Sequence, residues 1–292
     1  MKYLYLPLLI LSFVASPVHA ASSVEDATVN LYCRLKSGNT TYSTSGSGVF
    51  VSDRGVILTN AHVAQYFLLA GEKGRVRGTC TVRTGSPAKD TYTASLLYLS
   101  PLWIEANVAE FKKKIPTGTG EGDFALLYVT GAVKGGTLPP TFPYITPSFL
   151  YATEGESVTI AGYPTENRNF KEIQRELPRL VTTSTITSVR SFTPSTSAEV
   201  LTIASSSAAS AGVSGGPVVK SDGTLAGIVS TKGGSLLRAV SVSHMNTKLM
   251  SETGMTLSGM LIGDLAMRAQ TNRALITPKQ VIGLRDGLLR KR

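Results

Sequence analysis

Residues 212–230 read GVSGGPVVKSDGTLAGIVS. Glycines stand on both sides of Ser214, and two short apolar runs follow, 216–219 and 226–230, with a polar turn between them. Glycine lets the backbone turn tightly, and short β-branched runs bounded by Gly, Ser and Asp are typical of antiparallel strands. This stretch therefore predicts a β-sheet in which a serine occupies a tight turn at the start of a strand.

The same pattern of short apolar runs and turn residues covers most of the chain, so we expect an all-β fold. A Pro-rich stretch, 138–148, divides twelve such runs into two groups of six, the number that two six-stranded barrels need. It therefore predicts the connection between two halves. The expected strands are 27–35, 47–51, 55–59, 78–84, 92–98, 124–129, 157–162, 181–189, 200–204, 216–219, 226–230 and 237–242.

Four further segments break this alternation. Residues 103–119 and 166–179 are expected to be helical or loop insertions. Residues 245–253 suit a short helix capped near Ser243. The tail, 255–292, has apolar residues at spacings that fit short amphipathic helices docked on the barrels or, alternatively, a basic membrane-surface segment.

The first twenty residues have the composition of an export signal. Lys2 is followed by an apolar run from 4 to 14, and small residues lead up to Ala20. This pattern predicts a Sec-type signal, 1–20, that is cut after Ala20, with an uncleaved membrane anchor as the alternative. The run is shorter than the roughly 20 residues that a membrane span needs. We therefore expect a secreted, periplasmic or cell-envelope protein with no transmembrane span once the signal is removed.

Two cysteines, Cys33 and Cys80, are the only ones in the chain. An even count in an oxidising compartment indicates one disulfide, and two buried free thiols are the alternative. The bridge would close a loop that contains His62 and would contribute about 4 kcal/mol in the chain-entropy account.

Composition limits the partners that this chain can have. Hydrophobic residues make up 42% and charged residues 16%, which fits a folded globular protein. The formal charge is +10, but the basic residues are scattered, with clusters only at 112–114 and 290–292. No basic run is interleaved with stacking aromatics, so we expect no nucleic-acid partner. No His, Cys or acidic residues have the spacing of metal ligands, so no metal and no cofactor are expected.

Histidine narrows the search for acid–base chemistry because the chain has only three, and His19 lies in the expected signal. His62 ends an apolar run, where a small-residue turn would present its ring, whereas His244 suits a helix-capping or surface role. Asp123 directly precedes a strongly apolar run. Each of these has a structural explanation alone. Together they provide what a serine hydroxyl needs, namely a base and a carboxylate that orients the base.

The glycines beside Ser214 have a second consequence. They allow the N–H groups of Gly212 and Ser214 to converge on an incoming carbonyl oxygen, as an oxyanion hole does.

Three segments carry a family resemblance, namely 59–62 (TNAH), 123–127 (DFALL) and 212–217 (GVSGGP). In order and setting they resemble the histidine, aspartate and serine motifs of trypsin-like serine peptidases, and they are closer to the bacterial, HtrA-like branch than to the digestive enzymes. The resemblance covers roughly residues 27–252. It implies two perpendicular six-stranded antiparallel barrels, with His62 and Asp123 on the first and Ser214 on the second. The expected divisions are 1–20 signal, 21–146 first barrel, 147–252 second barrel and 253–292 tail.

The resemblance also implies which residues contact substrate. Ala208 would lie at the base of the primary pocket, Ser210 near its wall, and Ser230, Lys232 and Gly233 along the strand that pairs with the substrate backbone. Because Ala208 carries no charge, a small or medium apolar residue before the cut is expected. Lys232 would favour acidic neighbours, unless it is simply a solvated loop lysine.

Two features depart from well-known members of the family. Val213 stands where an aspartate usually precedes the nucleophile, which puts activation by a newly released N-terminus in doubt. The tail is too short for the PDZ domain that HtrA-like enzymes often carry.

The expected function is that of an exported serine endopeptidase acting on polypeptides. The alternatives are a catalytically silent binding or chaperone-like module on the same fold, and an esterase that uses the same three residues. The sequence does not predict an oligomeric state.

Overall fold

The computed structural model describes residues 22–72, 76–110, 120–192, 199–204, 207–233 and 236–289, and at 231–233 and 236 it describes only the backbone. The expected export signal and the basic clusters at 112–114 and 290–292 lie outside this part of the chain. None of the helices within it combines the length and the apolar character needed to cross a bilayer.

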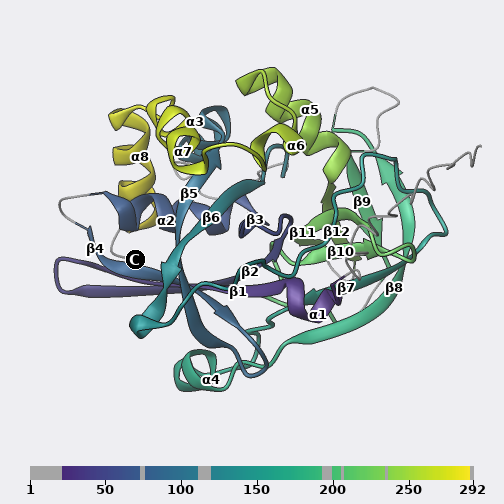
Figure 1. The fold of residues 1–292 in the computed structure, drawn as a ribbon, viewed down its shortest axis with the longest axis horizontal. Coiled ribbons are helices and arrows are strands. Elements are labelled where there is room, and N and C mark those ends of the chain that lie inside the picture. Colours follow the sequence, from purple (N-terminus) through teal and green to yellow (C-terminus); the bar gives the residue numbers. More distant parts are fainter. Residues whose placement is uncertain are drawn as a thin grey trace, which may run out of the picture.

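Two closed antiparallel barrels of six strands each form the body of the molecule (Figure 1). The first has the order β1-β2-β3-β6-β5-β4 and the second β10-β11-β12-β9-β8-β7. The strands of the first barrel are β1 (Thr28–Ser37), β2 (Thr40–Phe50), β3 (Val56–Thr59), β4 (Val76–Thr84), β5 (Lys89–Leu99) and β6 (Ala125–Ala132). Those of the second are β7 (Ser157–Gly162), β8 (Leu180–Arg190), β9 (Val200–Ile203), β10 (Pro217–Lys220), β11 (Leu225–Gly233) and β12 (Leu236–Ser241).

The predicted fold class is confirmed, and each of the twelve expected runs overlaps one of these strands. The largest boundary difference is at β2, which begins at Thr40 rather than at Ser47. Its first residues are Thr, Tyr and Ser with partly or fully exposed side chains, and they pair with the C-terminal part of β1. A search for apolar runs misses this part because strand pairing, and not burial, keeps it extended.

Buried apolar side chains form a core inside each barrel and a third cluster between the barrels. The third cluster joins Leu58 and Leu126 of the first barrel to Ile228 and Val240 of the second, and all four are at most 2% exposed. A fully buried side chain of this kind contributes roughly 1.5–3 kcal/mol. The two barrels are therefore held in one fixed arrangement by a shared apolar interface.

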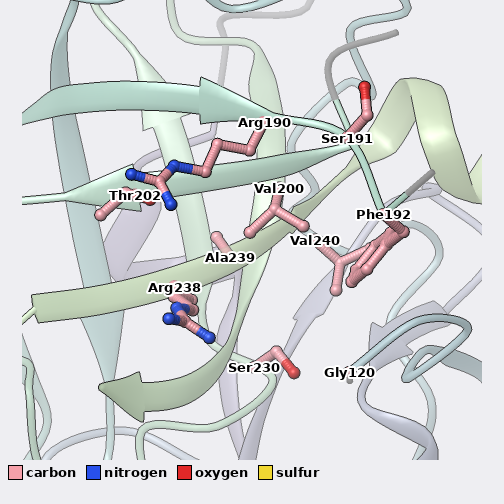
Figure 2. A pocket seen from close by; sticks show the side chains of 10 residues that line it. All are labelled: Gly120, Arg190, Ser191, Phe192, Val200, Thr202, Ser230, Arg238, Ala239 and Val240. Carbon is pink, nitrogen blue, oxygen red and sulfur yellow. The ribbon is translucent and has the colours of Figure 1, made fainter. Parts of the chain in front are cut away.

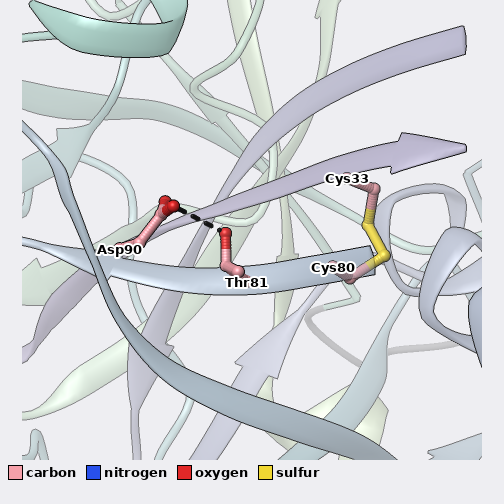
Figure 3. The surroundings of a disulfide bond; sticks show 4 residues. All are labelled: Cys33, Cys80, Thr81 and Asp90. Carbon is pink, nitrogen blue, oxygen red and sulfur yellow. Dashed lines mark hydrogen bonds between the residues drawn. A yellow bond between two sulfur atoms is a disulfide. The ribbon is translucent and has the colours of Figure 1, made fainter. Parts of the chain in front are cut away.

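Cys33 and Cys80 face each other across β1 and β4 and form a disulfide (Figure 3). The predicted bridge is confirmed, and the alternative of two free thiols is wrong. Beside it on β4, the Thr81 hydroxyl donates to Asp90 Oδ1 at 3.2 Å. The bridge joins the two strands across which the first barrel closes, so it constrains the loop that contains β2, β3 and His62.

Helices cover the barrels at several places. The helix α2 (Ala61–Gly71) was not predicted, because residues 60–63 were interpreted as a turn. Its Val63, Ala64 and Phe67 pack into the first core. Within the two predicted insertions, residues 101–110 and 170–175 are helical, whereas 111–119 lie outside the described residues. The helices are α1 (Val24–Ala27), α2, α3 (Pro101–Glu110), η1 (Val133–Gly135), α4 (Phe170–Arg175), α5 (Val242–Thr253), α6 (Leu257–Met260), α7 (Leu265–Ala274) and α8 (Pro278–Leu288).

The expected helix after the last strand is α5, and its cap lies two residues before Ser243, near which it was expected. The cap is Ser241, whose hydroxyl accepts the His244 N–H at 3.2 Å. The strand β12 runs directly into this helix, so the cap is the last residue of the strand.

The tail packs on the first barrel through α7 and α8 (Figure 1). Asn272 Nδ2 of α7 donates to the Leu97 carbonyl of β5 at 2.9 Å. Leu284 of α8 is fully buried in the first core. A Cβ at Gly283 would lie 2.8 Å from Val108 Cγ1, so α8 approaches α3 closely where it has no side chain. These helices are therefore part of the same folded body as the first barrel.

Candidate functional site

The start of α2 positions His62. The strand β3 ends at Thr59, Asn60 is the N-cap, and His62 lies in the first turn of the helix and not in a strand-end turn. The side chain of Asn60 does not cap the helix, because its Nδ2 donates to the Asp123 carbonyl at 2.8 Å. The same residue thus starts the helix and ties it to the chain that carries the carboxylate.

Asp123 directly precedes β6, the strand that pairs with β3, and its carboxylate faces the start of α2. Asp123 Oδ2 lies 2.8 Å from His62 Nδ1, and Oδ1 accepts the His62 backbone N–H at 3.0 Å. A carboxylate at a helix N-terminus is favoured by the helix dipole and satisfies an N–H that has no partner inside the helix. Asp123 is 4% exposed, so it supplies the cap that the Asn60 side chain does not.

The proximity of the two groups shifts both pKa values. Burial by itself would lower the pKa of His62, but the negative charge of Asp123 and its hydrogen bond outweigh burial, so the pKa of the imidazole is raised. Burial would raise the pKa of Asp123, but the charge of His62 and hydrogen bonds from His62 and Ser230 lower the pKa of this carboxyl. Asp123 is therefore ionised at neutral pH and attracts a proton on His62.

Ser214 lies in a loop whose shape only glycine allows. Gly212 and Gly215 have φ of 90° and 86°, in the left-handed region. A Cβ at Gly215 would lie 2.1 Å from the Ser47 carbonyl oxygen, and one at Gly212 would lie 2.5 Å from the Tyr163 carbonyl oxygen. The backbone of the loop therefore packs closely against both barrels.

A hydrogen bond to the Ala211 carbonyl fixes the orientation of the peptide group between Ala211 and Gly212. The Ala211 carbonyl accepts the Thr165 N–H at 2.7 Å. In a planar trans peptide the following N–H points the opposite way, so the Gly212 N–H faces away from Thr165. The N–H groups of Gly212 and Ser214 have no hydrogen-bond partner among the residues that the structure describes. Both donors are therefore available beside the Ser214 hydroxyl.

Ser47 of β2 connects the first barrel to this loop. Its side chain is fully buried, and its hydroxyl donates to the Gly212 carbonyl at 2.8 Å and accepts the Tyr163 N–H at 2.9 Å. Its backbone N–H donates to the Ser214 carbonyl at 2.8 Å. The side chain of Val213 is fully buried in the second core. Hydrogen bonds and apolar packing thus hold the loop on both sides of Ser214.

Ser230 of β11 lies between the nucleophile loop and the carboxylate. Its hydroxyl donates to Asp123 Oδ2 at 2.8 Å, and its carbonyl accepts the Ser214 hydroxyl at 3.4 Å. The structure therefore brings together all three residues of the candidate triad, His62 and Asp123 in direct contact and Ser214 through Ser230. A proton transfer from Ser214 to His62 requires the hydroxyl to turn from this carbonyl toward the ring.

The other expected substrate contacts lie around the same loop and strand. Ala208 is fully buried in the second core, and the Ser210 N–H donates to its carbonyl at 2.8 Å. Lys232 and Gly233 belong to β11, where they pair with β12. The pairing of β11 with β10 and its loop ends at Val229, so in the described chain residues 230–233 have a backbone edge with no neighbouring strand.

His244 lies apart from this cluster, at the start of α5. Its backbone N–H takes part in the helix cap, as expected, but its side chain is buried and not at the surface. The ring centroid lies 5.1 Å from that of Phe192, and Nδ1 lies 3.5 Å from Glu199. Burial is the main reason that the pKa of His244 is lowered, so the ring packs as a neutral group.

The sequence analysis missed several residues of the site, namely Ser47, Asn60 and Thr165, as well as the side-chain role of Ser230. Ser47 stands between two glycines in the segment 46–48, and this local signal marks a close backbone approach. Asn60 and Thr165 act through contacts that only the folded chain shows. Among the described residues, no group of three or more His, Cys, Asp or Glu side chains is arranged to hold a metal.

A comparison of the sequence with known families identifies one match. A family described as trypsin-like peptidase domain matches residues 46–228, which is more than half of the chain and covers parts of both barrels. No curated protein matches the chain. On the strength of the family match and the two six-stranded barrels, the chain belongs to the trypsin-like peptidase family.

Proposed function

We propose that the protein is a serine endopeptidase that uses His62, Asp123 and Ser214 as its catalytic triad. The observation that carries the proposal is the juxtaposition of the buried His62–Asp123 pair with Ser214 and two N–H donors that have no partner in the described chain. A trypsin-like peptidase family supports hydrolysis of polypeptides.

The reaction uses these groups in order. Ser214 Oγ turns from the Ser230 carbonyl, gives its proton to His62 Nε2 and bonds to the substrate carbonyl carbon. The carbonyl oxygen becomes an oxyanion that accepts hydrogen bonds from the N–H groups of Gly212 and Ser214. His62 then protonates the leaving amine, the C–N bond breaks, and an acyl group remains on Ser214. Water, deprotonated by His62, releases this acyl group.

The backbone edge at residues 230–233 supports binding of an extended polypeptide. A substrate segment can add to this edge as a further strand, which fixes its direction without reading its sequence. Ala208 and Ser210 would then face the side chain just before the cleaved bond. Because Ala208 carries no charge, we propose a small or medium apolar residue at that position.

The loop around Ser214 supports activity without activation by a new N-terminus. In place of an ion pair at residue 213, Ser47 binds the carbonyls of Gly212 and Ser214, and Thr165 binds that of Ala211. We propose that the mature fold holds the oxyanion donors in position by itself.

Export is a separate part of the proposal. Residues 1–20 have the pattern of a Sec-type signal, and a disulfide joins Cys33 and Cys80. Both fit a protein that works outside the cytoplasm, secreted or in the cell envelope. Sequencing the N-terminus of the protein exported by a bacterial host tests the cut after Ala20.

A broad fluorophosphonate label tests the catalytic assignment. We expect labelling of the purified protein and of Ser221→Ala, whose exposed serine lies in the turn between β10 and β11, and no labelling of Ser214→Ala. Digestion of an unfolded protein such as casein then separates two alternatives. Binding without fragments would indicate a silent binding module, and cleavage of ester but not amide substrates would indicate an esterase.

A further inference from the structure

A cavity of about 270 Å³ is lined by residues of the second barrel and by Gly120 (Figure 2). Ser230 and Gly120 form its end nearest the triad, and both contact Asp123: the Ser230 hydroxyl donates to Oδ2, and the Gly120 carbonyl accepts the Asp123 N–H at 3.1 Å. The remaining walls come from β8, β9 and β12 of the second barrel and from Ser191 and Phe192, which follow β8. A group bound here would lie within one residue of the catalytic carboxylate.

Strand register explains which side chains face the cavity. On β9, Leu201 points into the second core, so its neighbours Val200 and Thr202 point outward. Arg190 of β8 pairs with Val200, and Arg238 of β12 pairs with Thr202. Residues paired across antiparallel strands share a face, so both arginines lie on the outer face that lines the cavity.

Neither guanidinium group has a hydrogen bond or an ion pair with any residue in the described chain. Both side chains are exposed, so their charged groups can reach a ligand in the cavity. The two positive charges line the same cavity, and a carboxylate bound there can accept charge-assisted hydrogen bonds from them.

The acidic residues nearest in sequence to the walls do not fill this role. Asp123 binds His62 and Ser230. Glu121 pairs with Lys248 at 3.2 Å, and Glu199 lies 3.5 Å from His244 Nδ1. The cavity therefore has an excess of positive charge, together with the apolar side chains of Val200 and Phe192 that can contact methylene groups.

We propose that this cavity is a subsite for an acidic side chain of the polypeptide substrate, whose carboxylate is bound by Arg190 and Arg238. The proposal rests on the proposed peptidase function. The cavity opens beside Ser230, the first residue of the unpaired edge, so the acidic residue lies on the N-terminal side of the cleaved bond. Arginine is suited to this task because its planar group binds carboxylates through two hydrogen bonds.

The test starts from a cleaved peptide found with a peptide library. Glutamate and glutamine versions are made at each of the four positions before the bond and at the positions after it, and kcat/KM is compared within each protein. We expect a Glu-to-Gln ratio of about ten at one position before the bond, as for a hydrogen bond to a charged group, and a smaller ratio at high salt.

Three variants decide the assignment. Arg190→Gln and Arg238→Gln should each lower the ratio, and the double variant should bring it to about one. Arg34→Gln, an exposed arginine on β1 of the other barrel, should leave the ratio unchanged. Melting temperatures establish that each variant is folded. The proposal is overturned by a wild-type ratio near one everywhere, by a preference confined to positions after the bond, or by a preference that persists in the double variant.

A binding measurement keeps this test separate from the proposed function. In Ser214→Ala, which cannot form an acyl-enzyme, fluorescence anisotropy compares labelled Glu and Gln peptides. Absence of fluorophosphonate labelling in the wild type, combined with tighter Glu binding, would refute the peptidase and support the subsite. Normal labelling with equal binding of the two peptides would refute the subsite alone.

Discussion

The two halves of the candidate site are held in different ways. His62 and Asp123 both belong to the first barrel and contact each other directly, at 2.8 Å. Ser214 belongs to a loop of the second barrel, and its hydroxyl contacts the Ser230 carbonyl at 3.4 Å. The first barrel thus supplies both residues of the acid–base pair, whereas the nucleophile comes from the second barrel and its position depends on contacts between barrels.

Each barrel contributes one serine that supports the other half. Ser47 extends from the first barrel to the carbonyls on both sides of Val213, and Ser230 extends from the second barrel to Asp123. Both hydroxyls donate within the site, that of Ser47 to the Gly212 carbonyl and that of Ser230 to Asp123 Oδ2. We therefore expect the alignment of the triad to depend on the interface between the two barrels. Three variants test this expectation.

Asp123→Asn should have the largest effect because it removes the negative charge that contacts His62. We expect kcat to fall about ten-thousandfold, since the amide no longer favours the ring tautomer that accepts the Ser214 proton. Asp286→Asn, an exposed carboxylate on α8, is the matched control and should retain full activity. A decrease of less than about tenfold would mean that Asp123 only caps α2.

The pH profile follows from the same pair. Protonated His62 cannot act as a base, so activity rises as pH increases through its pKa. Because Asp123 raises this pKa from the ordinary value of 6.5, the acid limb of kcat/KM should lie above pH 6.5. In Asp123→Asn the attraction is lost, and the His62 titration, followed by NMR, should move to lower pH. A titration that does not move would contradict the assigned pairing.

Ser47→Ala should have a smaller effect because it acts through the loop. The Gly212 carbonyl loses its donor and the buried Tyr163 N–H loses its acceptor, so the oxyanion donors are less well fixed. We expect kcat to fall about a hundredfold with KM nearly unchanged, because the oxyanion forms only during reaction. A parallel loss in KM would instead indicate general disruption of the site. Ser43→Ala, exposed on the same strand, is the control.

Local signals in the sequence were enough to predict the twelve strands, the disulfide and the three residues that the fold brings together. Apolar alternation marks strands because one face of each is buried, and the glycines around Ser214 mark a loop that admits no Cβ. The helix α2 was missed because residues 61–71 are apolar on several faces, and short apolar runs do not distinguish a helix from a strand.

Long-range contacts explain what the sequence could not predict. Ser230 was assigned to the substrate strand, and nothing near it in sequence shows that its hydroxyl donates to Asp123, 107 residues away. Arg190 and Arg238 likewise line one cavity only because β9 pairs with both β8 and β12. Contacts of this kind depend on how the barrel closes and on the register of its strands. The hydrophobic pattern of one strand alone does not determine either, because both depend on all the strands together.

Ser230→Ala should have the smallest effect of the three. It tests the support that the second barrel gives to Asp123 of the first barrel. The variant removes the hydroxyl donor of Asp123 but leaves the Ser230 carbonyl that the Ser214 hydroxyl contacts. We expect kcat to fall about tenfold, as for loss of one hydrogen bond to a charged group. With one donor fewer, the carboxylate attracts the imidazolium proton more strongly, so the acid limb should move upward by less than about one pH unit. Unchanged kcat with an unshifted limb, matching the Ser221→Ala control, would show that the first barrel holds its acid–base pair without help from the second.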